Sequence, residues 1–174
     1  MTTFESLNIA PGILQSIKDL GFENPMPVQA EVIPIALKGE RDIIALAQTG
    51  TGKTAAFGIP LLQNIDSSFN KTQALVLCPT RELCLQITKD IEDLATHTKN
   101  VRILAVYGGA SIEQQIRELK KGVHIIVATP GRLIDLMGRK AAKLDEVNTV
   151  VLDEADEMLN MGFLDSIEQI LSEV

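Results

Sequence analysis

The chain has 174 residues, enough for one domain with a full hydrophobic core. Apolar residues make up 45% and charged residues 22%, and no apolar run is long enough to cross a bilayer. The net charge of −7 argues against nucleic-acid binding by bulk electrostatics, and one Tyr, five Phe and no Trp exclude extensive base stacking. Any such contact depends on a few placed groups or on a segment outside these residues. We expect a cytoplasmic protein without membrane contact.

The first 39 residues predict two helices joined by a stiff loop. The stretch APGILQSIKDLG (10–21) has a proline near its first turn and a glycine at its end, and VQAEVIPIALKG (28–39) also stops at a glycine. The loop FENPMP (22–27) between them contains two prolines. We expect residues 1–39 to form a helical segment packed on a core domain of residues 40–174.

Five short apolar runs follow, nearly continuous in apolar character as in strands buried on both faces of a parallel sheet. They are DIIALA (42–47), ALVLC (74–78), VRILAVY (101–107), HIIVA (124–128) and TVVLD (149–153). Two helical patterns lie between them, TRELCLQITKDIEDLATH (80–97) and SIEQQIRELKKG (111–122). Strands alternating with helices predict an α/β fold, a three-layer α/β/α domain with a mostly parallel sheet.

The first run leads into a glycine-rich loop, AQTGTGKT (47–54). Gly50 and Gly52 let successive backbone N–H groups point at a phosphate, and the helix start adds partial positive charge. Lys53 can reach the terminal phosphates of a nucleotide, and the Thr54 hydroxyl can bind Mg²⁺. The strict P-loop pattern begins with Gly, where this chain has Ala47. The order of strand, loop, Lys-Thr and helix still favours a P-loop over a plain turn.

The later runs also end in unusual polar clusters. PTRE (79–82) follows the second run, Gly108 and Gly109 follow the third, and TPGR (129–132) follows the fourth. Because all of these clusters come at carboxyl ends of strands, we expect them at the ligand-binding edge of the sheet.

The last run ends in four acids, Asp153, Glu154, Asp156 and Glu157. They could sit in the first turn of a helix, where the dipole favours them, or they could face a metal ion. The P-loop favours the metal, because a Mg²⁺-bound triphosphate needs a second carboxylate anchor. Asp153 fits that role, and Glu154 fits the orienting or deprotonating of an attacking water. Asp156 and Glu157 remain open as helix-start acids or coupling residues.

The cysteines and histidines receive no chemical role. Cys78 and Cys84 have five residues between them, and no histidine or further cysteine lies at a zinc spacing. We expect both cysteines to be reduced, packed thiols. We expect His97 and His124 to be structural or solvated.

These motifs together resemble the DEAD-box RNA helicases. AQTGTGKT (47–54) and the sequence Asp-Glu-Ala-Asp (153–156) match the two signatures of that family. GFENPMPVQ (21–29) is similar to its Q motif, with Phe4 as the isolated upstream aromatic residue. PTREL (79–83), the Gly pair and TPGR resemble the RNA-binding motifs of the first RecA-like domain, and the resemblance covers essentially the whole chain in the family's order.

The resemblance implies a RecA-like ATP-binding domain that uses ATP and Mg²⁺, with RNA as its sequence-independent partner. Gln29 would read the adenine edge and Phe22 would pack on the base. Asp156 would couple the ATP state to domain closure. The implied nucleotide-binding residues are Phe22, Gln29, Gln48, Thr49, Gly50, Thr51, Gly52, Lys53 and Thr54, with Lys53, Asp153 and Glu154 catalytic and Thr54 and Asp153 on the metal. The implied RNA-binding residues are Pro79, Thr80, Arg81, Gly108, Gly109, Thr129, Pro130, Gly131 and Arg132.

The chain departs from the family in one respect. It contains no Ser-Ala-Thr sequence, which in the family lies on a strand inside the sheet, and no second RecA-like domain with its arginine finger. We expect most of a first domain, which is either poorly stable alone or pairs with another chain.

Three hypotheses compete. The first is the ATP-binding half of an RNA helicase, the second a nucleotide-gated RNA clamp or chaperone that never unwinds processively, and the third a P-loop kinase or other NTPase. The third explains neither PTREL (79–83) nor TPGR (129–132).

Overall fold

A computed structural model describes residues 2–174 of the chain. The residues divide into two compact units, which we describe separately. The first comprises the residues up to Asp66 together with Lys89–Asn100, and the second comprises Ser67–Thr88 and Val101–Val174. Among the described residues, no helix has the length and apolar character needed to cross a membrane.

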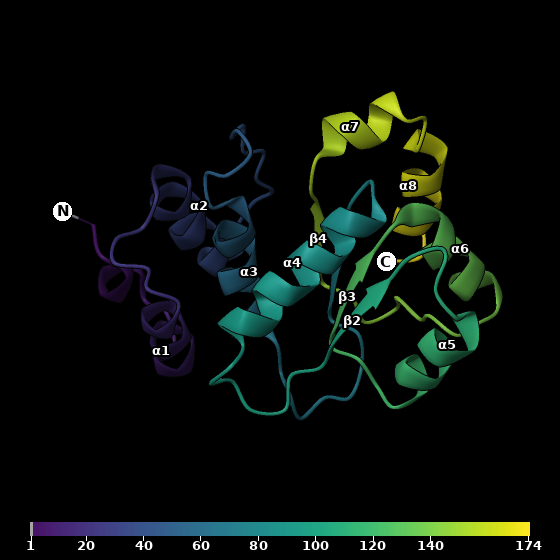
Figure 1. Ribbon diagram of the computed structural model, residues 1–174, viewed down its shortest axis with the longest axis horizontal. Helices are drawn as coiled ribbons and strands as arrows, with labels where there is room; N and C mark the ends of the chain where they lie inside the picture. Colours follow the sequence, from purple (N-terminus) through teal and green to yellow (C-terminus); the bar gives the residue numbers. More distant parts are fainter. Residues whose placement is uncertain (1) are drawn as a thin grey trace. The chain divides into compact units, whose positions relative to one another are not determined.

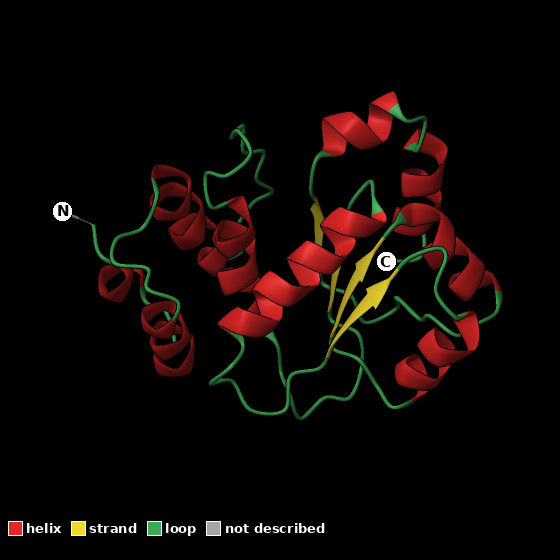
Figure 2. Cartoon of the chain, in the orientation of Figure 1, coloured by secondary structure: helices red, strands yellow, loops and turns green. Residues whose placement is uncertain are grey.

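The first unit is helical (Figure 2). It contains the 3-10 helix η1 (Phe4–Leu7) and helices α1 (Pro11–Asp19), α2 (Pro27–Lys38) and α3 (Lys53–Asn64). The two N-terminal helices and the proline-containing loop between them confirm the sequence prediction. Helix α2 packs along α3, and the Ile33 and Ile59 side chains are fully buried there.

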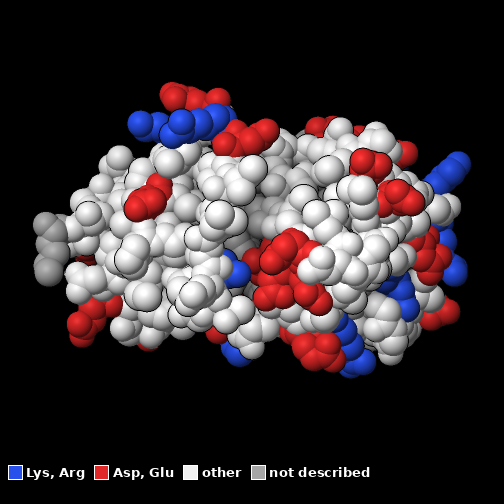
Figure 3. Space-filling view, turned by 90° about the horizontal axis from the view of Figure 1, so that it is seen from above, with Lys and Arg blue, Asp and Glu red and all other residues white. Residues whose placement is uncertain are grey.

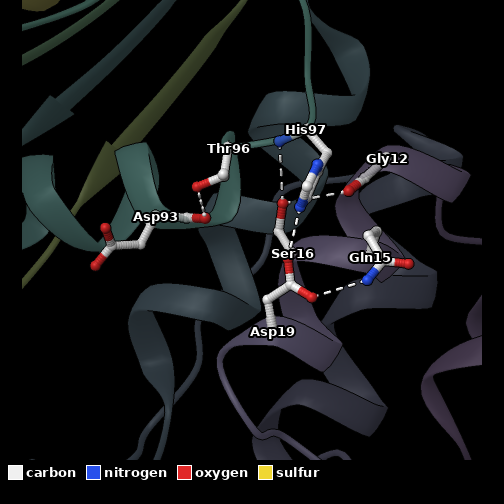
Figure 4. A network of polar contacts seen from close by, with 7 residues as sticks. All are labelled: Gly12, Gln15, Ser16, Asp19, Asp93, Thr96 and His97. Atoms are coloured by element: carbon white, nitrogen blue, oxygen red, sulfur yellow. Dashed lines mark hydrogen bonds and ion pairs between the residues drawn. The ribbon is translucent and has the colours of Figure 1, made fainter.

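Polar contacts hold α1 against the turn that follows the last residues of α4 (Figure 4). The Ser16 hydroxyl donates to the Gly12 carbonyl at 3.2 Å and accepts from the His97 backbone N–H at 3.4 Å. The His97 Nε2 lies 2.6 Å from Asp19 Oδ2, and Gln15 Nε2 donates to Asp19 Oδ1 at 2.8 Å. His97 therefore has a structural contact, in agreement with its assignment from the sequence.

The second unit is built on a parallel sheet in the order β2-β3-β1-β4. The strands are β1 (Ala74–Leu77), β2 (Ile103–Val106), β3 (Ile125–Ala128) and β4 (Thr149–Leu152). In the register, Leu75 lies opposite Ile126 on β3 and Val150 on β4. β4 is an edge strand, because it pairs with β1 alone.

Helices cover both faces of this sheet (Figure 1). Helices α5 (Ile112–Lys120), α6 (Pro130–Gly138), α7 (Ala155–Asn160) and α8 (Leu164–Leu171) contribute to one apolar core, into which Leu75, Leu77 and Ile126 project. The first half of α4 (Arg81–Leu94) lies against the other face, where the buried Cys84 thiol reaches the Val127 carbonyl at 3.1 Å. The predicted α/β class, with helices on both faces of a parallel sheet, is confirmed.

The predicted strand at residues 42–47 is wrong. The segment has no strand structure, and the side chains of Ile44 and Leu46 are 92% and 97% exposed. A strand takes its backbone hydrogen bonds from a neighbouring strand, and no described strand pairs with this segment. The observed sheet therefore has four of the five expected strands.

Candidate functional site

The glycine-rich loop adopts a tight turn that leads directly into α3. Gly50 and Gly52 have φ values of 76° and 79°, which a side chain rarely tolerates, and Gly52 is the N-cap of the helix. The Thr51 hydroxyl donates to the Gln48 carbonyl at 2.6 Å and closes the turn. Lys53 and Thr54 occupy the first helical turn with partly exposed side chains. The N–H groups of a helix start and an adjacent ammonium group form a site suited to an anion.

The Gln29 side chain on α2 is hydrogen-bonded to this loop. Its side chain is only 4% exposed; Nε2 donates to the Gly52 carbonyl at 3.1 Å, and Oε1 accepts from the Met26 backbone N–H at 2.9 Å. A Cβ on Gly52 would overlap the Gln29 amide. The structure thus connects the predicted base-reading residue directly to the predicted phosphate loop.

Phe22 lies at the surface, in the segment between α1 and α2. Its ring is 43% exposed and lines a pocket of about 360 Å³. The pocket is lined by Phe4, Glu5, Leu14, Ile17, Lys18, Gly21, Phe22 and Glu23. Phe4, the isolated upstream aromatic residue, is buried beneath it at 3% exposure. An exposed aromatic face is the group that a nucleobase would stack on.

The four acids divide between the end of β4 and the start of α7. The backbone N–H of Asp153 continues the sheet by donating to the Leu77 carbonyl at 2.9 Å, and its side chain is buried. Glu154 is the N-cap of α7 and has a left-handed backbone, with φ 52° and ψ 49°. Asp156 and Glu157 are exposed in the first turn of the helix, where the dipole favours them. The helix start therefore accounts for two of the four acids by position.

Figure 3 shows Asp and Glu side chains gathered in a dense cluster on one face of the molecule. The charges of Asp153 and Glu154 act on a buried group of the interior. A hydrogen bond with Cys84, burial, and the negative charges of Cys84, Asp153 and Glu154 raise the pKa of the Cys78 thiol far above its usual range. Both cysteines are free and buried, so the expectation of reduced, packed thiols is confirmed.

The predicted RNA-binding segments lie in the second unit and contact one another. Thr80 precedes α4, and its hydroxyl accepts from the Leu83 backbone N–H at 3.2 Å. The Arg81 guanidinium lies over the Tyr107 ring, 5.1 Å from its centre. A Cβ on Gly109 would lie 3.5 Å from Arg81 Nη1, so the Gly pair and the start of α4 are neighbours.

The TPGR segment (129–132) forms the start of α6. Thr129 is its N-cap and its backbone N–H donates to the Val106 carbonyl at 2.9 Å, while Pro130 occupies the first helical turn. Arg132 Nη1 donates to the Ala110 carbonyl at 3.1 Å and to Gln115 Oε1 at 3.0 Å. The structure thus connects Arg132 to the loop that carries Gly108 and Gly109.

Sequence reasoning missed Tyr107 and Gln115. Gln115 is 5% exposed, and its Nε2 donates to the Tyr107 carbonyl at 3.2 Å. The signal was its position, because residue 115 shares the helix face of Ile112, Ile116 and Leu119 and is a polar residue where the pattern expects an apolar one. For Tyr107, the last residue of an apolar run, the sequence carried no comparable signal.

The predicted metal ligands, Thr54 and Asp153, both supply oxygen atoms, as Mg²⁺ prefers. The described residues contain no group of three His, Cys, Asp or Glu side chains that could hold a metal by themselves. Thr54 lies in the first unit and Asp153 in the second, and Mg²⁺ is commonly bound through one or two such oxygen donors together with nucleotide phosphates and water.

The sheet, the helices on its two faces and the glycine-rich loop that opens α3 are the features of an α/β domain with a P-loop. A family model described as DEAD/DEAH box helicase matches residues 26–174, and the chain belongs to that family.

The names of individual relatives agree with this family assignment. The chain is 55% identical over 174 residues to the DEAD-box ATP-dependent RNA helicase CshA of Bacillus cereus. It is 52% identical over 174 residues to the ATP-dependent RNA helicase CshA of Listeria monocytogenes. Each match covers all of this chain and 33% of the relative. The crystal structure of a DEAD box protein from the hyperthermophile Methanococcus jannaschii superimposes with a TM-score of 0.94 at 44% identity, covering 99% of this chain and 47% of that one. The chain thus spans about a third of the length of these curated relatives.

Proposed function

We propose that the chain is the ATP-binding domain of a DEAD-box RNA helicase, which couples Mg²⁺–ATP binding and hydrolysis to RNA backbone binding and local duplex unwinding. The observation that carries this proposal is the Gln29 amide, which bonds to the Gly52 carbonyl of the loop at 3.1 Å. A side chain that holds the phosphate loop and keeps amide groups for a base can link base recognition to phosphate binding. The RNA helicase names of the relatives support the same function.

In this proposal the first unit binds the nucleotide. The Phe22 ring packs on the base, Gln29 reads its edge, and the backbone N–H groups of the loop surround the phosphates. Lys53 neutralises the terminal phosphates in the ground state. The loop residues involved are Gln48, Thr49, Gly50, Thr51, Gly52, Lys53 and Thr54.

The acidic residues at the end of β4 take part in ATP hydrolysis. Thr54 and Asp153 would hold Mg²⁺ together with the nucleotide, and the ion would neutralise charge on the transferring phosphate. Glu154 orients or deprotonates the attacking water, and its place as the N-cap of α7 puts its carboxylate on the short connection between β4 and α7. Asp156, one position into α7, is the coupling residue.

The RNA backbone is bound by the second unit. The residues are Pro79, Thr80, Arg81, Gly108, Gly109, Thr129, Pro130, Gly131 and Arg132. Arginine side chains, hydroxyls and backbone amides bind phosphate and sugar without reading bases, so binding is independent of sequence. A few placed cations also reconcile RNA binding with the net charge of −7.

We further propose a second RecA-like domain in the full-length protein as the partner of residues 40–174, with residues 1–39 as the Q-motif segment. A cytoplasmic location remains a prediction from the sequence. The competing function, a nucleotide-gated clamp or chaperone, uses the same residues and differs only in lacking strand separation.

The test is a pair of assays on the full-length protein, RNA-stimulated ATP hydrolysis and separation of a labelled RNA duplex. Lys53→Ala should weaken nucleotide binding, because Lys53 contacts the phosphates before reaction. Glu154→Gln should keep nucleotide binding and lose about 10²–10⁴-fold in turnover, the usual contribution of a general base. ATP hydrolysis without strand separation would favour the clamp, and Glu154→Gln turning over at the wild-type rate would remove Glu154 from the mechanism.

A further inference from the structure

Gln115 is a buried polar side chain in an apolar helix face, and both ends of its amide are used. The Nε2 donates to the Tyr107 carbonyl at 3.2 Å, and Oε1 accepts from Arg132 Nη1 at 3.0 Å. An apolar residue would fill the same position without desolvating an amide. The amide therefore contributes something other than packing, namely a bridge between the loop after β2 and the start of α6.

The bridge fixes one edge of the Arg132 guanidinium and leaves its other N–H groups available to a ligand. The Nη1 group has two hydrogens, and the bonds to Gln115 and to the Ala110 carbonyl, the latter at 3.1 Å, use both. The three N–H groups on Nε and Nη2 take no part in these bonds. A guanidinium is a planar fork, so fixing one edge sets the direction of the others.

Tyr107 extends the same connection to the second arginine. Its carbonyl accepts from Gln115, and its ring lies under the Arg81 guanidinium at 5.1 Å. Arg81 itself is exposed. The two arginines, which come from helices far apart in the sequence, are thus linked through Tyr107: Arg81 contacts its ring, and Arg132 reaches its carbonyl through Gln115.

We propose that Gln115 and Tyr107 are positioning residues that hold Arg132 and Arg81 as a preorganised pair of cations for two phosphates of the RNA backbone. The proposal rests on the RNA-binding function proposed above. Long cationic side chains lose rotamer freedom when they bind a phosphate, and holding them in place beforehand removes part of that loss. With a net charge of −7, the chain depends on placed cations rather than on bulk attraction.

The experiment measures binding of a fluorescein-labelled oligouridylate to the full-length protein, with Mg²⁺ and a non-hydrolysable ATP analogue, over a range of KCl concentrations. Gln115→Met keeps the length of the side chain and removes both hydrogen bonds. The matched control is Gln114→Met, because Gln114 is exposed on the same helix. Arg132→Ala and the Gln115→Met/Arg132→Ala double variant complete a cycle.

We expect Gln115→Met to weaken RNA binding roughly tenfold or more, as for the loss of a charge-assisted hydrogen bond. The slope of log affinity against log salt should fall by about 0.7, one phosphate contact on a single strand. The double variant should bind no more weakly than Arg132→Ala, and Gln114→Met should bind like the wild type. A purely structural role would lower the melting temperature and leave the salt slope unchanged.

Two failures are distinguishable. Wild-type affinity in Gln115→Met, or additive losses in the double variant, would overturn the positioning role while RNA binding stands. Failure of the wild-type protein to bind RNA would overturn the proposed RNA-binding function itself. An Arg132→Ala variant that binds normally would overturn the role of Arg132 and with it the positioning role of Gln115. If Gln115→Met does not fold, Gln115→Glu applies the same test, because its carboxylate competes with phosphate for Arg132 and has no donor for Tyr107; normal binding and salt slope there would overturn the proposal.

Discussion

The Gln29 amide has the capacity to hold the P-loop and read a base at the same time. An amide has two N–H donors and two lone pairs, and the bonds to Gly52 and Met26 use one of each. The remaining N–H and lone pair match the acceptor N7 and the donor N6 of adenine. Guanine presents an acceptor where adenine has its donor, so one of these bonds becomes a repulsion.

We therefore predict that ATP binds more tightly than GTP and that Gln29→Ala removes this preference. A comparable pair of hydrogen bonds from one side chain to a base contributes about 1–3 kcal/mol of discrimination. The measurement is a titration of both nucleotides against the wild-type and Gln29→Ala proteins in the same buffer. Equal affinities in the wild type, or an unchanged preference in the variant, would show that Gln29 only supports the loop.

The individual site residues that could be predicted from the sequence are those with a recognisable motif around them. The motifs around Lys53 and Asp153 predicted a chemical role for each, and the structure places one at the start of α3 and the other at the end of β4. Gln115 could be found only as a polar residue on an apolar face, because its partners lie on two other segments. Such partners depend on the tertiary fold, which a single helix pattern does not contain.

The P-loop as an element offers a matched pair of glycines. Gly50 and Gly52 both have left-handed backbones, but a Cβ on Gly50 meets nothing within 4 Å, whereas one on Gly52 overlaps the Gln29 amide. Either alanine substitution introduces backbone strain of about 1–2 kcal/mol. Gly52→Ala must also move Gln29, which is buried and bonded at both ends.

We predict that Gly52→Ala lowers the free energy of unfolding by about 1–3 kcal/mol more than Gly50→Ala does, the usual loss for buried hydrogen bonds. Urea unfolding of both variants measures the difference. In a Gln29→Ala background the excess should disappear, because the overlapping group is gone. An excess that persists there would mean that Gly52 is needed for the turn alone.

Helix α1 carries a pH-dependent contact. The hydrogen bond from His97, followed by that from Gln15, lowers the pKa of Asp19 below its ordinary value of 3.8. A carboxyl group with a lowered pKa stabilises the folded state above the ordinary value and loses that contribution as the pH falls through the lowered one.

We predict that Asp19→Asn destabilises the chain at about pH 5 and that the two stability curves converge as the pH falls below 3.8. Urea unfolding at a series of pH values measures this. Gln15→Ala, which removes only the second contact, should show a smaller effect. A difference between wild type and Asp19→Asn that is independent of pH would assign the effect to packing.

At the level of elements, each helix predicted from the spacing of apolar residues is present among the described residues. The strand predicted from the apolar run at residues 42–47 is not. From Ile43 to Ala47 that segment is as apolar as β1 and β3, so its apolar character does not distinguish it from them. The difference is a partner, since a strand is stable only beside another strand. In the family, the strand with the Ser-Ala-Thr sequence lies inside the sheet, and these 174 residues contain no such sequence.

For the whole molecule, charge limits how RNA can be bound. The chain has 16 basic and 23 acidic residues, so its net field repels a polyanion. Binding then depends on local geometry, and Arg81 and Arg132 of the second unit are engaged in contacts with Tyr107, Gln115 and Ala110. This arrangement supports sequence-independent contact with a backbone through a few placed groups and offers little long-range electrostatic attraction.

The same contacts predict the behaviour of the 174-residue chain when it is studied alone: weak binding of adenine nucleotide, without RNA-stimulated ATP hydrolysis and without unwinding. In the family, part of the charge around the γ-phosphate comes from an arginine finger on the second RecA-like domain. Such a finger contributes about 10³–10⁵ in rate, or about 4–7 kcal/mol of barrier. In the proposed roles, Arg81 and Arg132 are not substitutes for that finger, because the contacts with Tyr107 and Gln115 would commit them to the RNA.

The measurement is a steady-state ATPase assay on the chain with and without single-stranded RNA, beside the full-length protein. Arg132→Ala in the isolated chain is the control, since loss of a residue held by Gln115 should leave its basal hydrolysis near the background rate. RNA stimulation of the isolated chain comparable to that of the full-length protein would contradict the prediction. It would mean that these residues already contain the cation that stabilises the transferring phosphate, and the roles proposed for Arg81 and Arg132 would have to be reassigned from RNA to nucleotide.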